Sequence, residues 1–230
     1  MGTPERAEGE KKYLKSDLEF FGVTMPDLRR VVKGATPADL THDELIAIVE
    51  GLWSKPIHER RMAAVVFLGN HPALLGPRDL PVIERLIRES KTWAYVDGLA
   101  VVVVGELIIR HPGALETLDR WAADDDFWIR RSALLGLLRS LRTGRLFTVF
   151  AGYAEPMLEE KEFFIRKAIG WVLRETAKEN ADEIFDWLAP RTHRASGVTM
   201  REAVKYLDLE RREILMSAYK EKRPATRSPR

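Results

Sequence analysis

A tryptophan and an aspartate four residues apart, Trp93 and Asp97, stand out among the 230 residues of this chain as candidates for chemistry. Side chains at that separation lie on the same face of a helix. Residues 99–104 that follow are all apolar, and a carboxylate entering such a helix is costly to bury unless it is paired. We therefore expect Asp97 either to pair with a base of a neighbouring repeat, such as Arg131, or to lie in a groove where it opposes a cationic partner or polarises water.

Patterns for other kinds of chemistry do not occur in the sequence. The chain has no cysteine, which excludes disulfides, thiolate zinc sites and a thiol nucleophile. The five histidines follow no metal-ligand spacing, and neither a Walker motif nor a GxGxxG motif occurs. We therefore expect no metal and no other cofactor.

The composition is that of an ordinary globular protein. Hydrophobic residues make up 45% and charged residues 31%, with a net charge of +2, so wholesale disorder is excluded. The charged N-terminus shows no secretory signal, and the longest apolar stretch, residues 98–109, contains Glu106 and is too short to span a bilayer. We expect a cytoplasmic protein with no membrane association. The basic residues 220–230 predict a disordered tail that solubilises the chain or contacts nucleic acid.

Helical periodicity runs through the chain and predicts a nearly all-α fold. Apolar residues recur three and four apart, for example in residues 44–52 and 134–141. Thr41 opens a capping box, and the pairs His71-Pro72 and His111-Pro112 indicate helix ends.

Four segments of the chain superimpose as repeats, beginning at His58, Trp93, Trp128 and Phe164 with spacings of 35, 35 and 36 residues. Each has the pattern of the second, more buried helix of an antiparallel pair. A helix-pair repeat of this length predicts an α-solenoid of HEAT-like pairs with a concave face. We expect one domain over residues 11–219, preceded by a flexible N-terminus of residues 1–10.

Departures from the repeat single out individual residues. The fourth repeat position holds the bases Arg61, Arg131 and Lys167, which predict a cationic ridge along the solenoid. The fifth position holds Asp97 where the other repeats have small or apolar residues, and the eighth holds the large Trp171. A solvated face for the bases and core packing for the tryptophans are the alternatives.

Several segments resemble the DNA alkylation repair family, the HEAT-like-repeat alkylpurine DNA glycosylases. Residues 161–175, KEFFIRKAIGWVLRE, are very close to the signature of that family. Residues 91–97 resemble its Trp-xxx-Asp segment, residues 126–135 its Trp-x-x-Arg segment, and residues 13–23 its N-terminal helix. Order and spacing agree with the family from residue 13 to residue 207.

The resemblance implies a monofunctional, monomeric glycosylase of base excision repair. Its substrates would be the cationic purines 3-methyladenine and 7-methylguanine in double-stranded DNA, excised without base flipping. Trp93, Asp97 and Trp171 are implied as the catalytic, lesion-facing cluster, on the concave side together with Arg131. DNA contacts are expected from the side chains of Arg131, Lys167, Tyr13, Arg61 and Thr24, the last standing where some relatives have a longer amide.

The residue types suit this reaction. An alkylated purine leaves as a good, cationic leaving group, and positive charge builds on the deoxyribose. The carboxylate of Asp97 would stabilise that charge and hold the attacking water. The indoles of Trp93 and Trp171 would offer electron-rich faces, and Arg131 and Lys167 would hold phosphates. A DNA-binding solenoid without excision and a protein-interaction scaffold are the alternatives.

Overall fold

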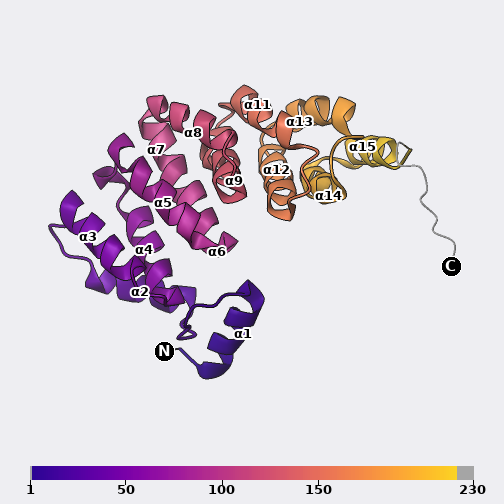
Figure 1. The fold of residues 1–230 in the computed structure, drawn as a ribbon. Coiled ribbons are helices and arrows are strands. Elements are labelled where there is room, and N and C mark those ends of the chain that lie inside the picture. Colours follow the sequence, from indigo (N-terminus) through magenta and orange to yellow (C-terminus); the bar gives the residue numbers. More distant parts are fainter. Residues whose placement is uncertain (1, 222–230) are drawn as a thin grey trace. The chain divides into compact units, whose positions relative to one another are not determined.

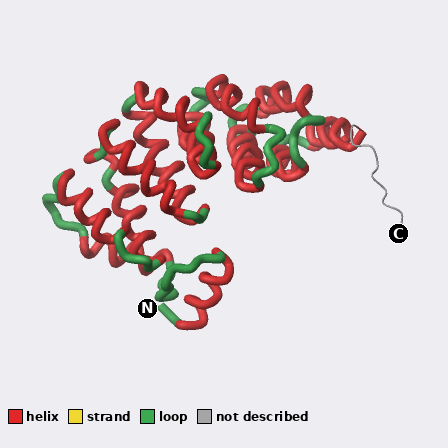
Figure 2. Tube along the Cα trace, viewed as in Figure 1, coloured by secondary structure: helices red, strands yellow, loops and turns green. Residues whose placement is uncertain are grey.

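The structure is a computed structural model that describes residues 2–221. Every regular element in this range is a helix, and β-structure is limited to an isolated parallel bridge between Glu19 and Ile57 (Figure 2). This confirms the predicted all-α fold. None of the helices in residues 2–221 has both the length and the apolar character to cross a membrane. The predicted basic tail lies outside the described residues, except that residues 220 and 221 end the last helix.

The chain forms two compact units, Met1–Ala114 and Leu115–Arg230 (Figure 1). The first unit contains α1 (Pro4–Leu14), α2 (Met25–Ala35), α3 (His42–Trp53), α4 (His58–Asn70), η1 (Pro72–Leu74), η2 (Pro77–Asp79), α5 (Leu80–Ser90), α6 (Trp93–Asp97), η3 (Gly98–Val104), α7 (Gly105–Arg110) and η4 (Pro112–Ala114). The second contains α8 (Leu115–Ala122), α9 (Phe127–Gly136), α10 (Leu138–Leu141), α11 (Phe147–Met157), α12 (Phe163–Thr176), α13 (Ala181–Leu188), η5 (Ala189–Arg191), α14 (Gly197–Ala203), η6 (Val204–Tyr206) and α15 (Leu209–Glu221).

Helices stack in pairs within each unit, as the repeat predicts. In the first unit α3 packs on α4 (Figure 1). Helix α4 also packs on η3. In the second unit α8 packs on α9, α9 on α12, and α12 on α14. This is the stacking of an α-solenoid. The prediction of one continuous domain with a concave groove concerns both units together and stays a prediction.

Predicted helix ends agree with the structure. The Thr41 hydroxyl accepts a hydrogen bond from the Glu44 amide, and the Glu44 carboxylate accepts one from the Thr41 amide, which completes the capping box of α3. His71 is the C-cap of α4 and His111 the C-cap of α7, and each is followed by a proline that opens a short 3₁₀ turn.

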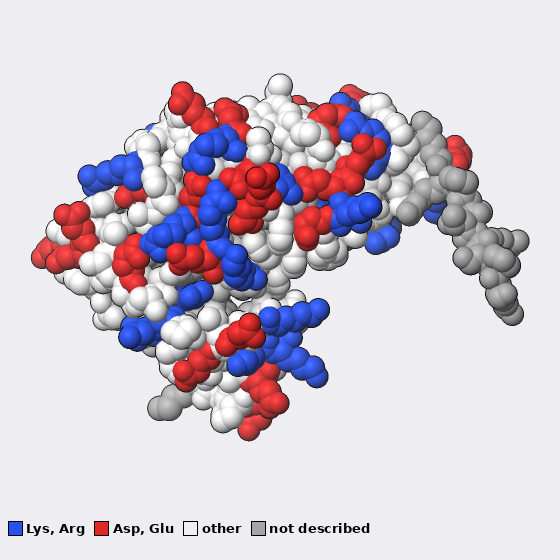
Figure 3. Space-filling model, viewed as in Figure 1, with Lys and Arg blue, Asp and Glu red and all other residues white. Residues whose placement is uncertain are grey.

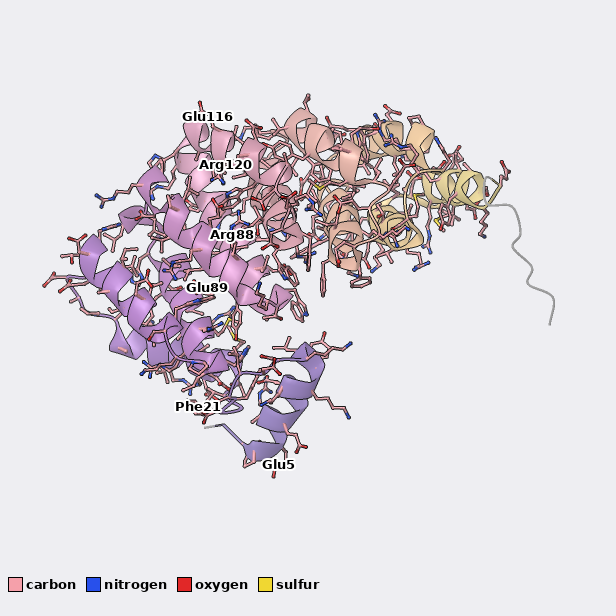
Figure 4. The ribbon with its side chains drawn as sticks, in the orientation of Figure 1. Glu5, Phe21, Arg88, Glu89, Glu116 and Arg120 are labelled. Atoms are coloured by element: carbon pink, nitrogen blue, oxygen red, sulfur yellow. The ribbon has the colours of Figure 1, made fainter. Side chains whose placement is uncertain are left out.

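The structure places most of residues 1–10 in α1, and the flexibility expected of them stays a prediction. The helix buries none of its side chains and is held through the loop that follows it (Glu5 and Phe21 are labelled in Figure 4). Gly22 has a φ of +68°, and a Cβ there would lie 2.2 Å from the carbonyl oxygen of Thr3. The buried Glu59 carboxylate accepts hydrogen bonds from the amides of the same loop, at residues 21 and 23. Tight backbone contacts therefore replace a hydrophobic interface.

Side-chain hydrogen bonds between helices join residues about one repeat apart in sequence. The separation is 36 residues from Trp53 to Glu89, 37 from His58 to Tyr95 and 35 from Lys167 to Glu202. Within each unit, these bonds join one repeat to the next along the chain.

Candidate functional site

Helix α6 presents the two residues that the sequence singles out. Trp93 opens the helix and Asp97 ends it, and both side chains are half-buried. The Thr92 hydroxyl caps the helix by accepting a hydrogen bond from the Ala94 amide at 3.4 Å. Tyr95 lies between the two candidates and is fully buried. The buried face of α6 therefore fixes the helix to the core, and its other face carries the tryptophan and the aspartate.

The backbone becomes a π-helix directly after Asp97, over η3. Short π-helical insertions are rare and occur frequently at functional sites. Gly98 lies so close to α4 that a Cβ there would come within 2.7 Å of Val65 Cγ1. Sequence analysis missed this π-helix, although a glycine entering a long apolar run was a signal of close packing. The close contact between α4 and η3 fixes the position of Asp97.

A neutral polar pair, His58 and Tyr95, holds the buried face of α6. The Tyr95 hydroxyl and His58 Nδ1 share a hydrogen bond of 2.6 Å, and the His58 ring stacks on Phe20 with a centroid distance of 4.4 Å. Burial lowers the pKa of His58 and raises the pKa of Tyr95. Both side chains are therefore neutral at pH 7, and this pair adds no charge beneath the Asp97 helix.

A cavity of about 450 Å³ adjoins Trp93 in the first unit. The exposed Tyr13 ring meets the Trp93 ring edge-on at its rim, with a centroid distance of 6.0 Å. Most of the other lining residues are apolar, and Glu10 and Arg29 supply charge. Such a cavity suits an apolar or planar group beside the indole. No group of His, Asp and Glu side chains within residues 2–221 is arranged to hold a metal ion.

Trp171 lies on α12 in the second unit and is half-buried. The preceding Gly170 contacts α14 so closely that a Cβ would lie 2.7 Å from the Cβ of Glu202. This contact fixes the helix that carries the indole. Trp93 and Asp97 belong to the first unit, so the assembly of all three into one catalytic cluster stays a prediction.

The bases of the fourth repeat position do not form an exposed cationic ridge. Arg131 is 3% exposed, and its Nη1 donates to the carbonyl oxygen of Phe164 at 2.6 Å. Lys167 Nζ donates to Glu202 at 2.7 Å. Arg61 lies over the Trp53 ring and donates to the carbonyl oxygen of Glu89 at 3.4 Å (Glu89 is labelled in Figure 4). Arg131 is thus buried against the next repeat, whereas the Lys167 side chain is 40% exposed, so the predicted ridge is interrupted at Arg131. Contacts of Arg61, Arg131 and Lys167 with DNA stay predictions.

The remaining predicted DNA contacts lie near the N-terminus. The Thr24 hydroxyl caps α2, since it accepts from the Asp27 amide at 3.3 Å and donates to the Asp27 carboxylate at 2.9 Å. Tyr13 is exposed at the end of α1, next to Lys11 and Lys12 in the last turn. Lys and Arg side chains gather beside α1 on the face drawn in Figure 3. Contacts of Tyr13 and Thr24 with DNA stay predictions.

Fold and site together define a helical-repeat protein that presents an indole and a carboxylate from one short helix. The family model described as DNA alkylation repair enzyme matches residues 1–207, and the chain belongs to this family. Membership assigns the protein a role in the repair of alkylated DNA, with DNA as its substrate.

Two solved structures share the fold. One is described as a predicted DNA alkylation repair enzyme from Enterococcus faecalis; it is 23% identical, has a TM-score of 0.79, and the match covers 91% of this chain and 98% of that one. The other is smu.31 from Streptococcus mutans UA159, which is 17% identical with a TM-score of 0.52 over 95% and 96% of the two chains. No curated protein matches the chain.

Proposed function

We propose that the protein is a monofunctional DNA glycosylase that hydrolyses the N-glycosidic bond of cationic alkylated purines in duplex DNA. The observation that carries this proposal is the position of Asp97 at the junction of α6 and the π-helix η3, four residues after Trp93. The family membership of the chain supports it.

Asp97 is proposed to act on the sugar. The bond from C1′ to the base nitrogen breaks with its electron pair moving to the cationic base, which leaves neutral. The carboxylate of Asp97 faces the positive charge that develops on the deoxyribose and accepts a hydrogen bond from the attacking water. The water oxygen bonds to C1′, and its proton passes to solvent. No general acid for the leaving base is required, because alkylation has already given it a positive charge.

Trp93 is proposed to face the cationic centre with its indole, since a cation is attracted to the face of an aromatic ring. The cavity beside the Trp93 ring supports this role, because it leaves room for a nucleotide component. Tyr13 meets the indole edge-on. Trp171 is proposed to supply a second indole from α12.

Release of free 7-methylguanine from methylated duplex DNA tests the proposal, with wild type compared with Asp97→Asn. Losing one preorganised electrostatic contact is expected to slow release by about 10²–10³-fold. Asp39→Asn makes the same chemical change at an exposed position of the first unit and should release base at the wild-type rate. Equal rates for wild type and Asp97→Asn would make Asp97 structural and the mechanism wrong. A wild type that binds duplex DNA and releases no base would indicate a binding protein instead.

A further inference from the structure

Two buried glutamates gather basic side chains along α12. Glu202 of α14 accepts hydrogen bonds from Lys167 Nζ at 2.7 Å, Arg174 Nη1 at 2.6 Å and Lys205 Nζ at 2.8 Å. Its side chain is 8% exposed. One carboxylate of the second unit is thus surrounded by three bases.

Glu175 of α12 repeats the arrangement. Its carboxylate accepts from Arg174 Nη2 at 3.0 Å, Lys178 Nζ at 2.7 Å and Arg142 Nη2 at 3.3 Å, and its side chain is 9% exposed. Arg174 bonds both glutamates and joins the two halves. We name the set of five bases and two glutamates the α12 cluster.

The α12 cluster has a surplus of positive charge, because five bases surround two carboxylates. Burial raises the pKa of Glu202, but hydrogen bonds from Lys167 and Lys205 outweigh burial and bring it to about 2. Burial also raises the pKa of Glu175, and hydrogen bonds from Lys178 and Arg174 bring it below its usual value. Both glutamates are ionised at neutral pH, so the surplus is three positive charges.

The positive charges of the cluster face solvent while the negative charges lie beneath them. Side-chain exposure is 40% for Lys167, 50% for Lys205, 49% for Arg142 and 39% for Lys178, far above that of the glutamates. An ammonium group has three donors; Lys205 Nζ gives one of them to Glu202, and Lys178 Nζ gives one to Glu175. The outer side of the cluster therefore offers unused donors to an anion.

The buried glutamates also hold the bases in place. A lysine on an open surface loses rotamer freedom when it binds an anion, which weakens binding. Here the ammonium groups are already fixed by hydrogen bonds. Trp171 lies four residues after Lys167 and three before Arg174 on α12, so these three side chains share one helix face. The cluster therefore flanks the indole assigned to the lesion.

We infer that the α12 cluster is a binding surface for the phosphate backbone of duplex DNA beside Trp171. The inference rests on the proposed function only in taking DNA as the ligand, and it adds Arg142, Arg174, Lys178 and Lys205 to the DNA-binding residues. Glu175 and Glu202 are positioning residues in this assignment. A phosphate diester carries one negative charge and oxygen acceptors that match the outward donors.

The test measures the binding of undamaged duplex DNA by fluorescence anisotropy at salt concentrations from about 50 to 200 mM. The double variant Lys178→Gln/Lys205→Gln removes two bases of the cluster. Lys161→Gln/Arg212→Gln removes the same charge from two exposed positions of the second unit. The cluster variant should reduce the salt slope by about two, since each phosphate contact contributes about one. The control pair should keep the wild-type slope.

Equal slopes for the two double variants would overturn the inference. It would also be overturned if the cluster variant bound duplex DNA normally and lost binding of a polyglutamate peptide, because the surface would then be a protein-binding one. The proposed glycosylase fails by a different observation. If the salt slopes are as expected but no 7-methylguanine is released, the DNA-binding surface is supported and the proposed glycosylase activity is wrong.

Discussion

The contact between α4 and η3 in the first unit is apolar, whereas the contact between α12 and α14 in the second unit is made through charged side chains. Helix α4 meets η3 through Gly98 against Val65 and through Gly69, where a Cβ would lie 3.2 Å from Val102 Cγ1. Helix α12 meets α14 through Glu202, which bonds Lys167 and Arg174. The repeat register decides where neighbouring helices meet. The residue types at that place decide whether the contact is apolar or ionic.

This difference bears on function. The carboxylate assigned to the reaction, Asp97, precedes the apolar joint, where a glycine and a π-helix set its position. The bases assigned to the DNA backbone lie at the ionic joint, where buried glutamates orient them. The apolar contact thus positions the carboxylate of Asp97, and the ionic contact positions the bases of the α12 cluster.

The largest effect on stability is expected when the charged side chain of a contact between repeats is removed. Arg131→Ala deletes a buried guanidinium bonded to the Phe164 carbonyl oxygen, at an expected loss of about 1.5–3 kcal/mol in the free energy of unfolding. The slope of DNA affinity against salt should stay at the wild-type value. Urea unfolding and the anisotropy titration measure the two quantities.

The control for Arg131 is Arg212→Ala, an exposed arginine of α15, which should change stability by less than about 0.5 kcal/mol. If Arg131→Ala instead kept its stability and lost about one from the salt slope, Arg131 would contact phosphate after all. The assignment of Arg131 to a contact between repeats would then be wrong.

A smaller loss is expected at the apolar joint. Gly98→Ala places a methyl group 2.7 Å from Val65 Cγ1, and overpacking of this kind costs about 1–3 kcal/mol. Release of 7-methylguanine should fall as well, because Asp97 is the preceding residue. Gly51→Ala in α3 is the matched change without neighbours, and it should raise stability by about 0.5–1 kcal/mol. A Gly98→Ala protein as stable as Gly51→Ala would contradict the close contact.

The last effect concerns the pH dependence of stability and separates the two units. Burial lowers the pKa of His58 from 6.5, so the folded chain binds fewer protons than the unfolded chain and loses stability as the pH falls below about 6.5. The pKa of Glu202 is lowered from 4.5 to about 2, so its contribution is complete above about pH 4.5 and is lost towards about pH 2.

Urea midpoints of wild type, His58→Gln and Glu202→Gln measure these windows. Between about pH 6.5 and 5 the wild-type midpoint should fall more steeply than that of His58→Gln. Glu202→Gln should run parallel to wild type in that range and diverge only below about pH 4.5. Parallel curves for wild type and His58→Gln would show that His58 does not titrate differently on folding.

Much of the fold could be predicted from local patterns. Helix ends follow from short-range chemistry, such as the Thr41 capping box and the proline after His71, and the repeat follows from apolar spacing. The placement of Trp93 and Asp97 on one helix was predictable for the same reason, because four residues make about one helical turn.

Partners across helices could not be predicted. The repeat aligned Arg131 with Lys167, but whether a base faces solvent or the next helix depends on residues about one repeat away, such as Phe164 and Glu202. The π-helix after Asp97 was equally hidden, because it depends on the approach of α4 to Gly98. Arg142 and Lys205 lay outside the compared segments, so their gathering around buried glutamates left no periodic signal.

The hydrogen bonds that join residues about one repeat apart have a consequence for how the chain folds. Separations such as 36 residues from Trp53 to Glu89 and 35 from Lys167 to Glu202 show that these helices contact partners only about one repeat away in sequence. Closing such loops costs little chain entropy, and proteins rich in near contacts fold quickly. Folding can nucleate at one helix pair and propagate to the next, as in other repeat proteins.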